Sequence, residues 1–301
     1  MPTRVLLLLF LIAVSWRSAG GWWGDGHEIV TRAAIRALPE EVPAFLKEGE
    51  ELVASTVYDP DLAKNRSLPN LRDREHPEHF LDIELLSGRP LPATRYEFVR
   101  LCREVGVRPS KVGFLPYAVA EWTEQLTLAL AEHRRWPGLK APESKALVYA
   151  GLLAHYAQDL FQPLHLTIHF DGYAPTGGDS SGGGGSKLHA GIHEKVDSLI
   201  ERLAPDPGAL AAACRPQRFG DLMAAVRARF EENHAKVGRV YELADGFEPP
   251  SEPAARFGWQ QAVGAAEFTA SLYLTAWKDS EEVRLPGWLD RPAPGNPPGG
   301  R

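Results

Sequence analysis

Helical periodicity dominates this chain of 301 residues. Apolar residues recur three and four positions apart, whereas the strict alternation of apolar and polar residues that is typical of strands is nearly absent. The pattern predicts a helix after Pro43 and further helices over residues 27–38, 115–135, 143–161, 191–204, 219–243 and 254–280. Because each helix has an apolar face to bury against a neighbour, the simplest architecture is an all-α fold, a single multi-helix domain.

The N-terminal segment has the composition of a secretory signal peptide. Arg4 precedes an apolar stretch over residues 5–14, and small residues follow at positions 18–21. This layout predicts a cleavable signal peptide over residues 1–21 and therefore a secreted or periplasmic protein. The apolar stretch is shorter than the ~20 residues that span a bilayer, and no later segment is both long enough and uncharged, so an integral membrane protein is not expected.

The rest of the chain can form one domain. Residues 22–285 are long enough, in a sequence with 44% hydrophobic residues, to bury a substantial core. The tail over residues 286–301 is rich in proline and glycine and is expected to be disordered, and residues 172–187 form a second irregular stretch. The only cysteines are Cys102 and Cys214, and the sequence leaves open whether they pair.

The charge balance limits the kind of partner. A formal net charge of −6 argues against a broad basic face that grips nucleic acid. An anionic substrate must then be held locally, and bound divalent cations would supply the local positive charge. No protein partner is predicted.

The strongest chemical signal is the segment His155-Tyr-Ala-Gln-Asp159-Leu-Phe-Gln-Pro163-Leu-His165, at the end of an apolar helical run. His155 and Asp159 are four residues apart, so their side chains lie on one helix face and can share a metal ion. Pro163 is expected to end the helix and to let His165 turn toward another ion. A buried carboxylate beside two imidazoles needs a cation or strong hydrogen bonds.

Three further segments carry candidate metal ligands, and each alone is weak evidence. They are Gly191–Asp197, which repeats the four-residue spacing with His193 and Asp197; Glu78–Asp82 with the upstream Tyr58–Lys64; and Trp22–His27. Together with the first motif they resemble the family that joins bacterial zinc-dependent phospholipase C to the single-strand-specific fungal nucleases. The resemblance spans residue 22 to about residue 278, and the spacing of residues 155, 159 and 165 is its most specific part.

The resemblance implies a trinuclear zinc site with three zinc ions. One of these ions would be bound by the amino group and carbonyl of an N-terminal tryptophan that signal cleavage exposes. The three implied groups of ligands are Asp61, His79, His155 and Asp159; His165, His193 and Asp197; and Trp22, His27 and again Asp159, which bridges two ions.

Two of these assignments stay open. Trp22 lies five residues before His27, as the family pattern requires, but Trp23 remains an alternative N-terminus. Asp61 is preferred to Asp59 because it places Lys64 three residues further on, where the family has a basic residue that contacts phosphate. The remaining candidate histidines, His76, His169 and His189, are expected to be exposed or to support the ligands.

The resemblance also implies a reaction, the hydrolysis of a phosphate ester by a hydroxide held between two zinc ions. Asp61 would orient this water or accept its proton, and Lys64 would add positive charge at the transition state. Phe80 and Asp82 match residues that bind the base in the nucleases, and the phospholipases share the same motif. These residues are therefore the expected substrate-binding pair.

The first interpretation is thus a secreted zinc phosphodiesterase that acts as an endonuclease with a preference for single-stranded nucleic acid. The alternative is a phospholipase C that acts on phospholipid head groups. Leu62 stands where choline-binding phospholipases place a tyrosine, and Ser198 stands where the nucleases have an asparagine. A third interpretation is a non-catalytic exported zinc-binding protein, which the scarcity of cysteine disfavours.

Overall fold

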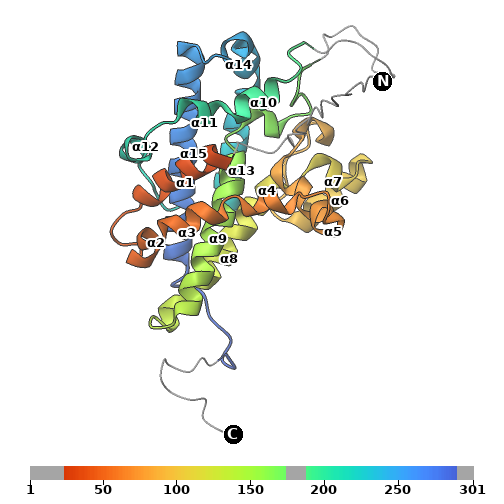
Figure 1. Ribbon diagram of the computed structural model, residues 1–301. Coiled ribbons are helices and arrows are strands. Elements are labelled where there is room, and N and C mark those ends of the chain that lie inside the picture. Colours follow the sequence, from red (N-terminus) through yellow and green to blue (C-terminus); the bar gives the residue numbers. More distant parts are fainter. Residues whose placement is uncertain (1–23, 174–187, 290–301) are drawn as a thin grey trace, which may run out of the picture.

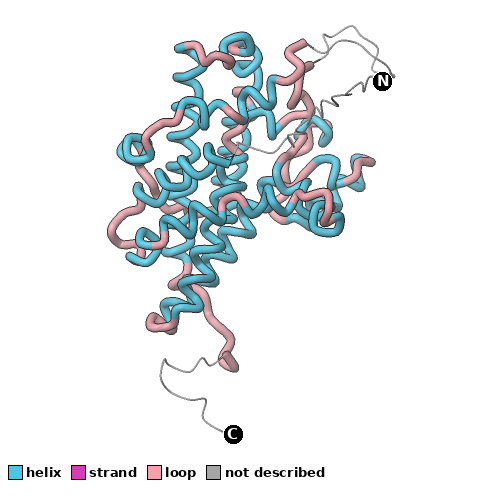
Figure 2. Tube along the Cα trace, viewed as in Figure 1, coloured by secondary structure: helices cyan, strands magenta, loops and turns pink. Residues whose placement is uncertain are grey.

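The computed structural model describes residues 24–173 and 188–289 and has an all-α fold, as the periodicity predicts. Over these two ranges it contains helices and loops but no strand, only isolated bridges between single residues (Figure 2). No helix within them is both long enough and apolar enough to cross a membrane. The expectations for the signal peptide, for Trp22 and Trp23, for residues 174–187 and for the last part of the tail lie outside the described residues.

The chain forms fifteen α-helices over the described ranges, with short 3₁₀ helices between some of them. They are α1 (Gly24–Arg36), α2 (Ala44–Glu48), α3 (Glu50–Thr56), α4 (Asp59–Ala63), α5 (Pro69–Glu75), α6 (Arg95–Val105), α7 (Pro109–Val112), α8 (Leu115–Arg135), α9 (Lys140–Asp159), α10 (Ile192–Asp197), α11 (Leu199–Leu203), α12 (Pro207–Ala213), α13 (Leu222–His234), α14 (Val237–Glu242) and α15 (Glu252–Asp279).

The long helices make the core of the domain. Helix α8 packs along α9, α15 packs on both, and α1 packs on α15 and α12. Most of the buried apolar side chains form one continuous cluster among these helices, and a second, smaller cluster lies beneath α10, α11 and α14. Figure 1 shows α4 to α7 gathered on one side of the long helices. The single multi-helix domain is therefore confirmed.

Two expected helices are each broken into two. The range 191–204 forms α10 and α11, which meet at Ser198, whose hydroxyl donates to the Glu194 carbonyl one turn earlier. Such back-bonding bends a helix. The range 219–243 forms α13 and α14, because the Lys236 N–H donates to the carbonyl of Asn233 and tightens the last turn of α13.

Several short helices were not predicted. The Asp59-Pro60-Asp61 segment begins α4, with Pro60 in the first turn, where its missing N–H costs nothing. The start of α6 carries a readable signal, since the Thr94 side chain accepts from the Glu97 N–H and the Glu97 side chain accepts from the Thr94 N–H. This is a capping box. Helices α5, α7 and α12 each begin with a proline.

Helix α9 approaches α3 very closely at Gly151. A Cβ atom at this position would lie 1.9 Å from Thr56 Oγ1 and 2.7 Å from the Val53 carbonyl oxygen. Neither atom belongs to a long flexible side chain, so the contact cannot relax without moving the helix. The absence of a side chain at Gly151 therefore allows α9 to pack closely against α3. This contact lies one turn before the candidate ligand His155.

We predict that Gly151→Ala destabilises the fold by about 1–3 kcal/mol, because an added methyl group overpacks the α3–α9 contact. Urea denaturation followed by circular dichroism measures this change. Gly220→Ala is the matched control, since a Cβ atom there meets nothing within 4 Å. Equal stability of the two variants would contradict the close approach.

Candidate metal centre

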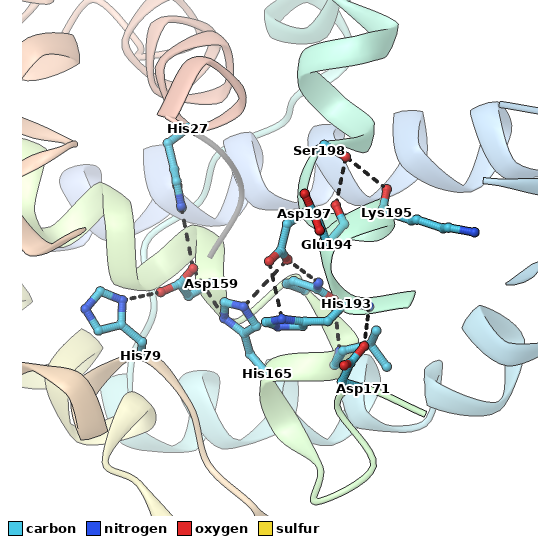
Figure 3. A network of polar contacts seen from close by, with 12 residues as sticks. His27, His79, Asp159, His165, Asp171, His193, Glu194, Lys195, Asp197 and Ser198 are labelled. Atoms are coloured by element: carbon cyan, nitrogen blue, oxygen red, sulfur yellow. Dashed lines mark hydrogen bonds and ion pairs between the residues drawn. The ribbon is translucent and has the colours of Figure 1, made fainter. Parts of the chain in front are cut away.

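The Asp159 carboxylate lies at the centre of a cluster of imidazoles. It is completely buried at the C-terminal end of α9, and His155 stands one turn earlier on the same face. Its Oδ2 atom lies 3.0 Å from His79 Nδ1 and 3.4 Å from His155 Nε2. Its Oδ1 atom lies 3.4 Å from His165 Nδ1 and 3.6 Å from His27 Nε2 (Figure 3). One carboxylate thus faces four imidazoles.

The sequence brings these side chains together from separate elements. His27 comes from α1, His155 and Asp159 from α9, and His79 and His165 from the 3₁₀ helices His76–His79 and Pro163–Leu166. The two 3₁₀ helices are joined through the backbone, because the Leu81 N–H donates to the His165 carbonyl at 2.8 Å. Helix α9 ends before Pro163, as predicted, and this ending lets His165 turn toward Asp159.

The possible ligand atoms fall into three groups, and within each group they all lie within 4.8 Å of one another. The groups are His27, His155 and Asp159; Asp61, His79 and His155; and His165, His193 and Asp197. Two ligands that share a tetrahedral zinc at ~2.0–2.2 Å are separated by about 3.4 Å. The contacts around Asp159 have this spacing, so they match ligands of common metal ions.

The third group lies beside the first two. Asp197 Oδ1 lies 3.7 Å from His165 Nε2, and Asp197 Oδ2 lies 3.5 Å from His193 Nδ1 (Figure 3). His165 therefore faces Asp159 with one ring nitrogen and Asp197 with the other. Helix α10 holds His193 and Asp197 four residues apart on one face.

Neighbouring groups orient the candidate ligands. His155 Nδ1 donates to the Val57 carbonyl at 2.9 Å, which leaves Nε2 turned toward the carboxylates. His27 Nδ1 lies 2.8 Å from Gln158 Oε1, and Gln158 Nε2 donates to Thr31 Oγ1. On the other side, Gln162 Nε2 donates to Asp197 Oδ1 at 2.5 Å. Such outer hydrogen bonds are typical of metal ligands.

The residues present fit a bound metal. Asp159 Oδ1, His165 Nδ1 and Asp197 Oδ2 are buried and form no hydrogen bond with any described residue, although they face one another across the cluster. Leaving such atoms unsatisfied is costly. A divalent cation would satisfy them, and ligand sets of nitrogen and oxygen suit zinc.

The candidate ligands differ in how the cluster shifts their pKa values. Burial lowers the pKa of His79 to about 3, so this imidazole is neutral at pH 7, as a ligand must be. Burial opposes ionisation of Asp159, but the adjacent His155 and His165 hold the pKa of its carboxyl well below its usual range. Asp159 therefore stays an anion. Burial also opposes protonation of these two imidazoles, but Asp159 raises the pKa of both, so a bound cation would take the place of their protons.

Asp61 and Lys64 lie at the edge of the cluster. Asp61 Oδ1 is 3.7 Å from His155 Nε2, 3.9 Å from His79 Nδ1 and 2.5 Å from Lys64 Nζ. The Asp61 side chain is 26% exposed, so it connects the buried ligands with solvent. Asp59, the alternative, is exposed and belongs to none of the three groups.

The remaining candidate histidines belong to none of the three groups, and one of them, His76, lines the cavity beside the cluster. His169 is exposed, and His189 stacks on Tyr173. Cys102 and Cys214 are both buried and free, so they do not form a disulfide.

A cavity of about 400 Å³ opens beside the cluster. Its lining residues are Lys64, His76, His79, Phe80, Asp82, Ser110, Lys111, Leu164, His165, Phe170 and His193. Phe80 and Asp82 were predicted, and burial raises the pKa of the Asp82 carboxyl to about 7. The wall formed by Ser110, Lys111 and Phe170 was not predicted, because no local pattern reveals which loops meet in space.

Comparisons with known proteins add little to this geometry. No family model and no curated protein matches the chain. Twelve chains of solved structures match, among them an alpha toxin from Clostridium absonum with 12% identity and a TM-score of 0.43. That match covers 88% of this chain, which spans 66% of the toxin chain, just under two thirds. A likeness of this size assigns no function to the chain.

We predict that Gln158→Leu lowers the affinity for zinc about 10–100-fold, because His27 loses the acceptor that orients its ring. Competition with a chromogenic chelator measures the change. Gln260→Leu, on the exposed face of α15, is the control. Unchanged affinity in the Gln158 variant would show that His27 binds no metal.

Proposed function

We propose that this chain is a zinc-dependent hydrolase of phosphate esters, a phosphodiesterase. The observation that carries the proposal is the position of Asp159, whose two oxygens face separate imidazoles beside a cavity of the size of a small ligand. Zinc held by such a set of ligands supplies positive charge for phosphoryl oxygens and activates water. Lys64, which stands where the resemblance implies a basic residue that contacts phosphate, lines the same cavity and supports the same chemistry.

The chain's own residues would act from the walls of the cavity. Asp61 is the partly exposed carboxylate of the cluster, so it orients the attacking water or accepts its proton. Lys64 contacts the phosphate and balances its charge. Phe80, Leu164 and Phe170 exclude water from the bound substrate, and Asp82 holds a hydroxyl or amide group of it.

A phospholipid head group fits this cavity better than single-stranded nucleic acid does. The sequence analysis ranked these two substrates the other way, with nucleic acid first. Binding of a single strand needs a basic groove with successive stacking platforms. The chain instead carries a net charge of −6 and offers a compact cavity. Nothing in the comparisons supports a nuclease.

Exposed apolar side chains near this cavity also favour a lipid. Leu62 on α4, next to the candidate ligand Asp61, is 67% exposed, and Ile168 and Phe170 beyond the His165 ligand are exposed as well. Of these three side chains Phe170 also lines the cavity, and exposed apolar side chains around a site suit a substrate with acyl chains. We therefore propose phospholipase C activity ahead of nuclease activity.

A purely structural zinc site is the third candidate. Structural zinc sites are closed, whereas catalytic sites keep an open position. Because His79, His165 and His193 line the cavity as well as the cluster, the ligands face a space that a substrate can enter. This arrangement favours catalysis.

We predict that Asp159→Asn abolishes hydrolysis of bis(4-nitrophenyl) phosphate and removes more than one equivalent of bound zinc. The amide keeps the shape of the carboxylate but loses the negative charge that would hold a cation on each side. Elemental analysis and a colorimetric assay measure both effects. Asp73→Asn, an exposed change on α5, serves as the control. Full metal content and activity in the Asp159 variant would refute the proposed function.

We also predict a higher kcat/KM for short-chain phospholipids than for single-stranded DNA, measured per phosphodiester with the same preparation and with or without chelator. The reason is that the cavity is of a size for one head group, whereas a net charge of −6 disfavours the long basic groove that a single strand needs. A preference for single-stranded DNA would restore the nuclease interpretation.

A further inference from the structure

The wall of the cavity formed by Ser110 and Lys111 is fixed to the segment that carries His79. The Asp82 N–H donates to the Val112 carbonyl at 2.7 Å, the Phe114 N–H to the Pro77 carbonyl at 2.7 Å, and Leu81 pairs with Gly113 in an antiparallel bridge. Helix α7, which carries Lys111, therefore has a defined position relative to the metal centre.

Gly113 allows this contact. Its φ angle of +95° lies in the left-handed region, and a Cβ atom would lie 2.0 Å from the Phe80 carbonyl oxygen. Only glycine fits here, so the backbone that follows Lys111 lies directly against Phe80. Two lining segments of the cavity, one with Phe80 and one with Lys111, are thus joined through their backbones.

Lys111 differs from the other basic groups of the cavity. Lys64 is paired with Asp61, and burial lowers the pKa of His76, which leaves its imidazole neutral at pH 7. Within the described part of the chain, no carboxylate lies within 4.0 Å of the Lys111 ammonium. The Asp82 carboxyl attracts the Lys111 ammonium over a longer distance than an ion pair. An ammonium placed in this way can pair with an anion on the substrate.

Resting on the proposed function, we propose that Lys111 selects substrates by charge: its ammonium binds a second anionic group, a phosphate, on the head group that occupies the cavity. A cationic head group is disfavoured for the same reason. Quaternary ammonium ions bind to aromatic faces, and although Phe80 and Phe170 line the cavity, the lysine charge opposes such a cation. The favoured substrate class is a phospholipid with a phosphorylated polyol head group.

The test uses zinc-loaded protein that begins at Trp22, the N-terminus expected after signal cleavage, and short-chain lipids below their critical micelle concentration. The three substrates are phosphatidylinositol 4-phosphate, phosphatidylglycerol and phosphatidylcholine. We expect Lys111→Gln to lower kcat/KM for the phosphorylated head group about tenfold, because roughly one charge pair is lost. The kcat/KM for phosphatidylglycerol should change by no more than about twofold. Lys111→Glu should raise the rate for phosphatidylcholine relative to the unmodified protein.

Arg108→Gln is the matched control, because Arg108 precedes α7, is exposed and does not line the cavity. Calorimetry adds a readout without turnover: inositol 1,4-bisphosphate should bind more weakly to the Lys111→Gln variant, and glycerol 3-phosphate should bind equally to both proteins. Thermal unfolding of each variant establishes that it is folded.

The outcomes separate the two proposals. Hydrolysis of all three lipids with no dependence on Lys111 overturns the charge selection and leaves the proposed function standing. Absence of hydrolysis of any phosphodiester, including bis(4-nitrophenyl) phosphate, overturns both. If a dinucleotide with a terminal phosphate shows the Lys111 dependence and the phosphoinositide does not, the second phosphate belongs to a nucleic acid and the lipid assignment is wrong.

Discussion

The structure depends on one buried carboxylate. Asp159 lies in the interior of a helical bundle, fully shielded from water, with imidazoles on both sides of it. A lone anion in this position would be very costly, so its surroundings must provide positive charge. The histidines are neutral when they act as ligands, and divalent cations are then the groups that balance Asp159. This requirement links the helix packing to the chemistry.

The elements around Asp159 keep the ligands in place. Gly151 lets α9 lie against α3, and the Val57 carbonyl just beyond α3 fixes the ring of His155. The two glutamines that flank Asp159 in the sequence orient ligands of different groups. Gln158 forms a hydrogen bond with His27, and Gln162 forms one with Asp197. Ligands that are fixed by packing and by hydrogen bonds keep the geometry that a metal needs.

The sequence predicted those parts of the structure that arise from local patterns. Helix α8 has the predicted bounds of 115–135, and the four-residue spacing of His155 and Asp159 placed both on one face, because helical geometry depends only on neighbours. The capping box at Thr94 is a local pattern of the same kind. The division of the range 191–204 depends on the Ser198 hydroxyl, whose effect on a helix varies with its surroundings.

Other parts of the site depend on contacts between distant segments. Lys111 lines the cavity because residues 77–82 pair with residues 112–115, and Phe170 lines it because its segment is joined to Leu81 through the His165 carbonyl. No periodicity encodes such pairing. The approach of His79 to Asp159 was implied only by the family resemblance. The most direct measurement is a crystal structure of the zinc-loaded protein with anomalous diffraction at the zinc absorption edge. The result that we predict is an anomalous peak on each side of the Asp159 carboxylate, within coordination distance of Oδ1 and of Oδ2. A carboxylate that bonds directly to protonated imidazoles, with no peak beside it, would contradict the metal centre.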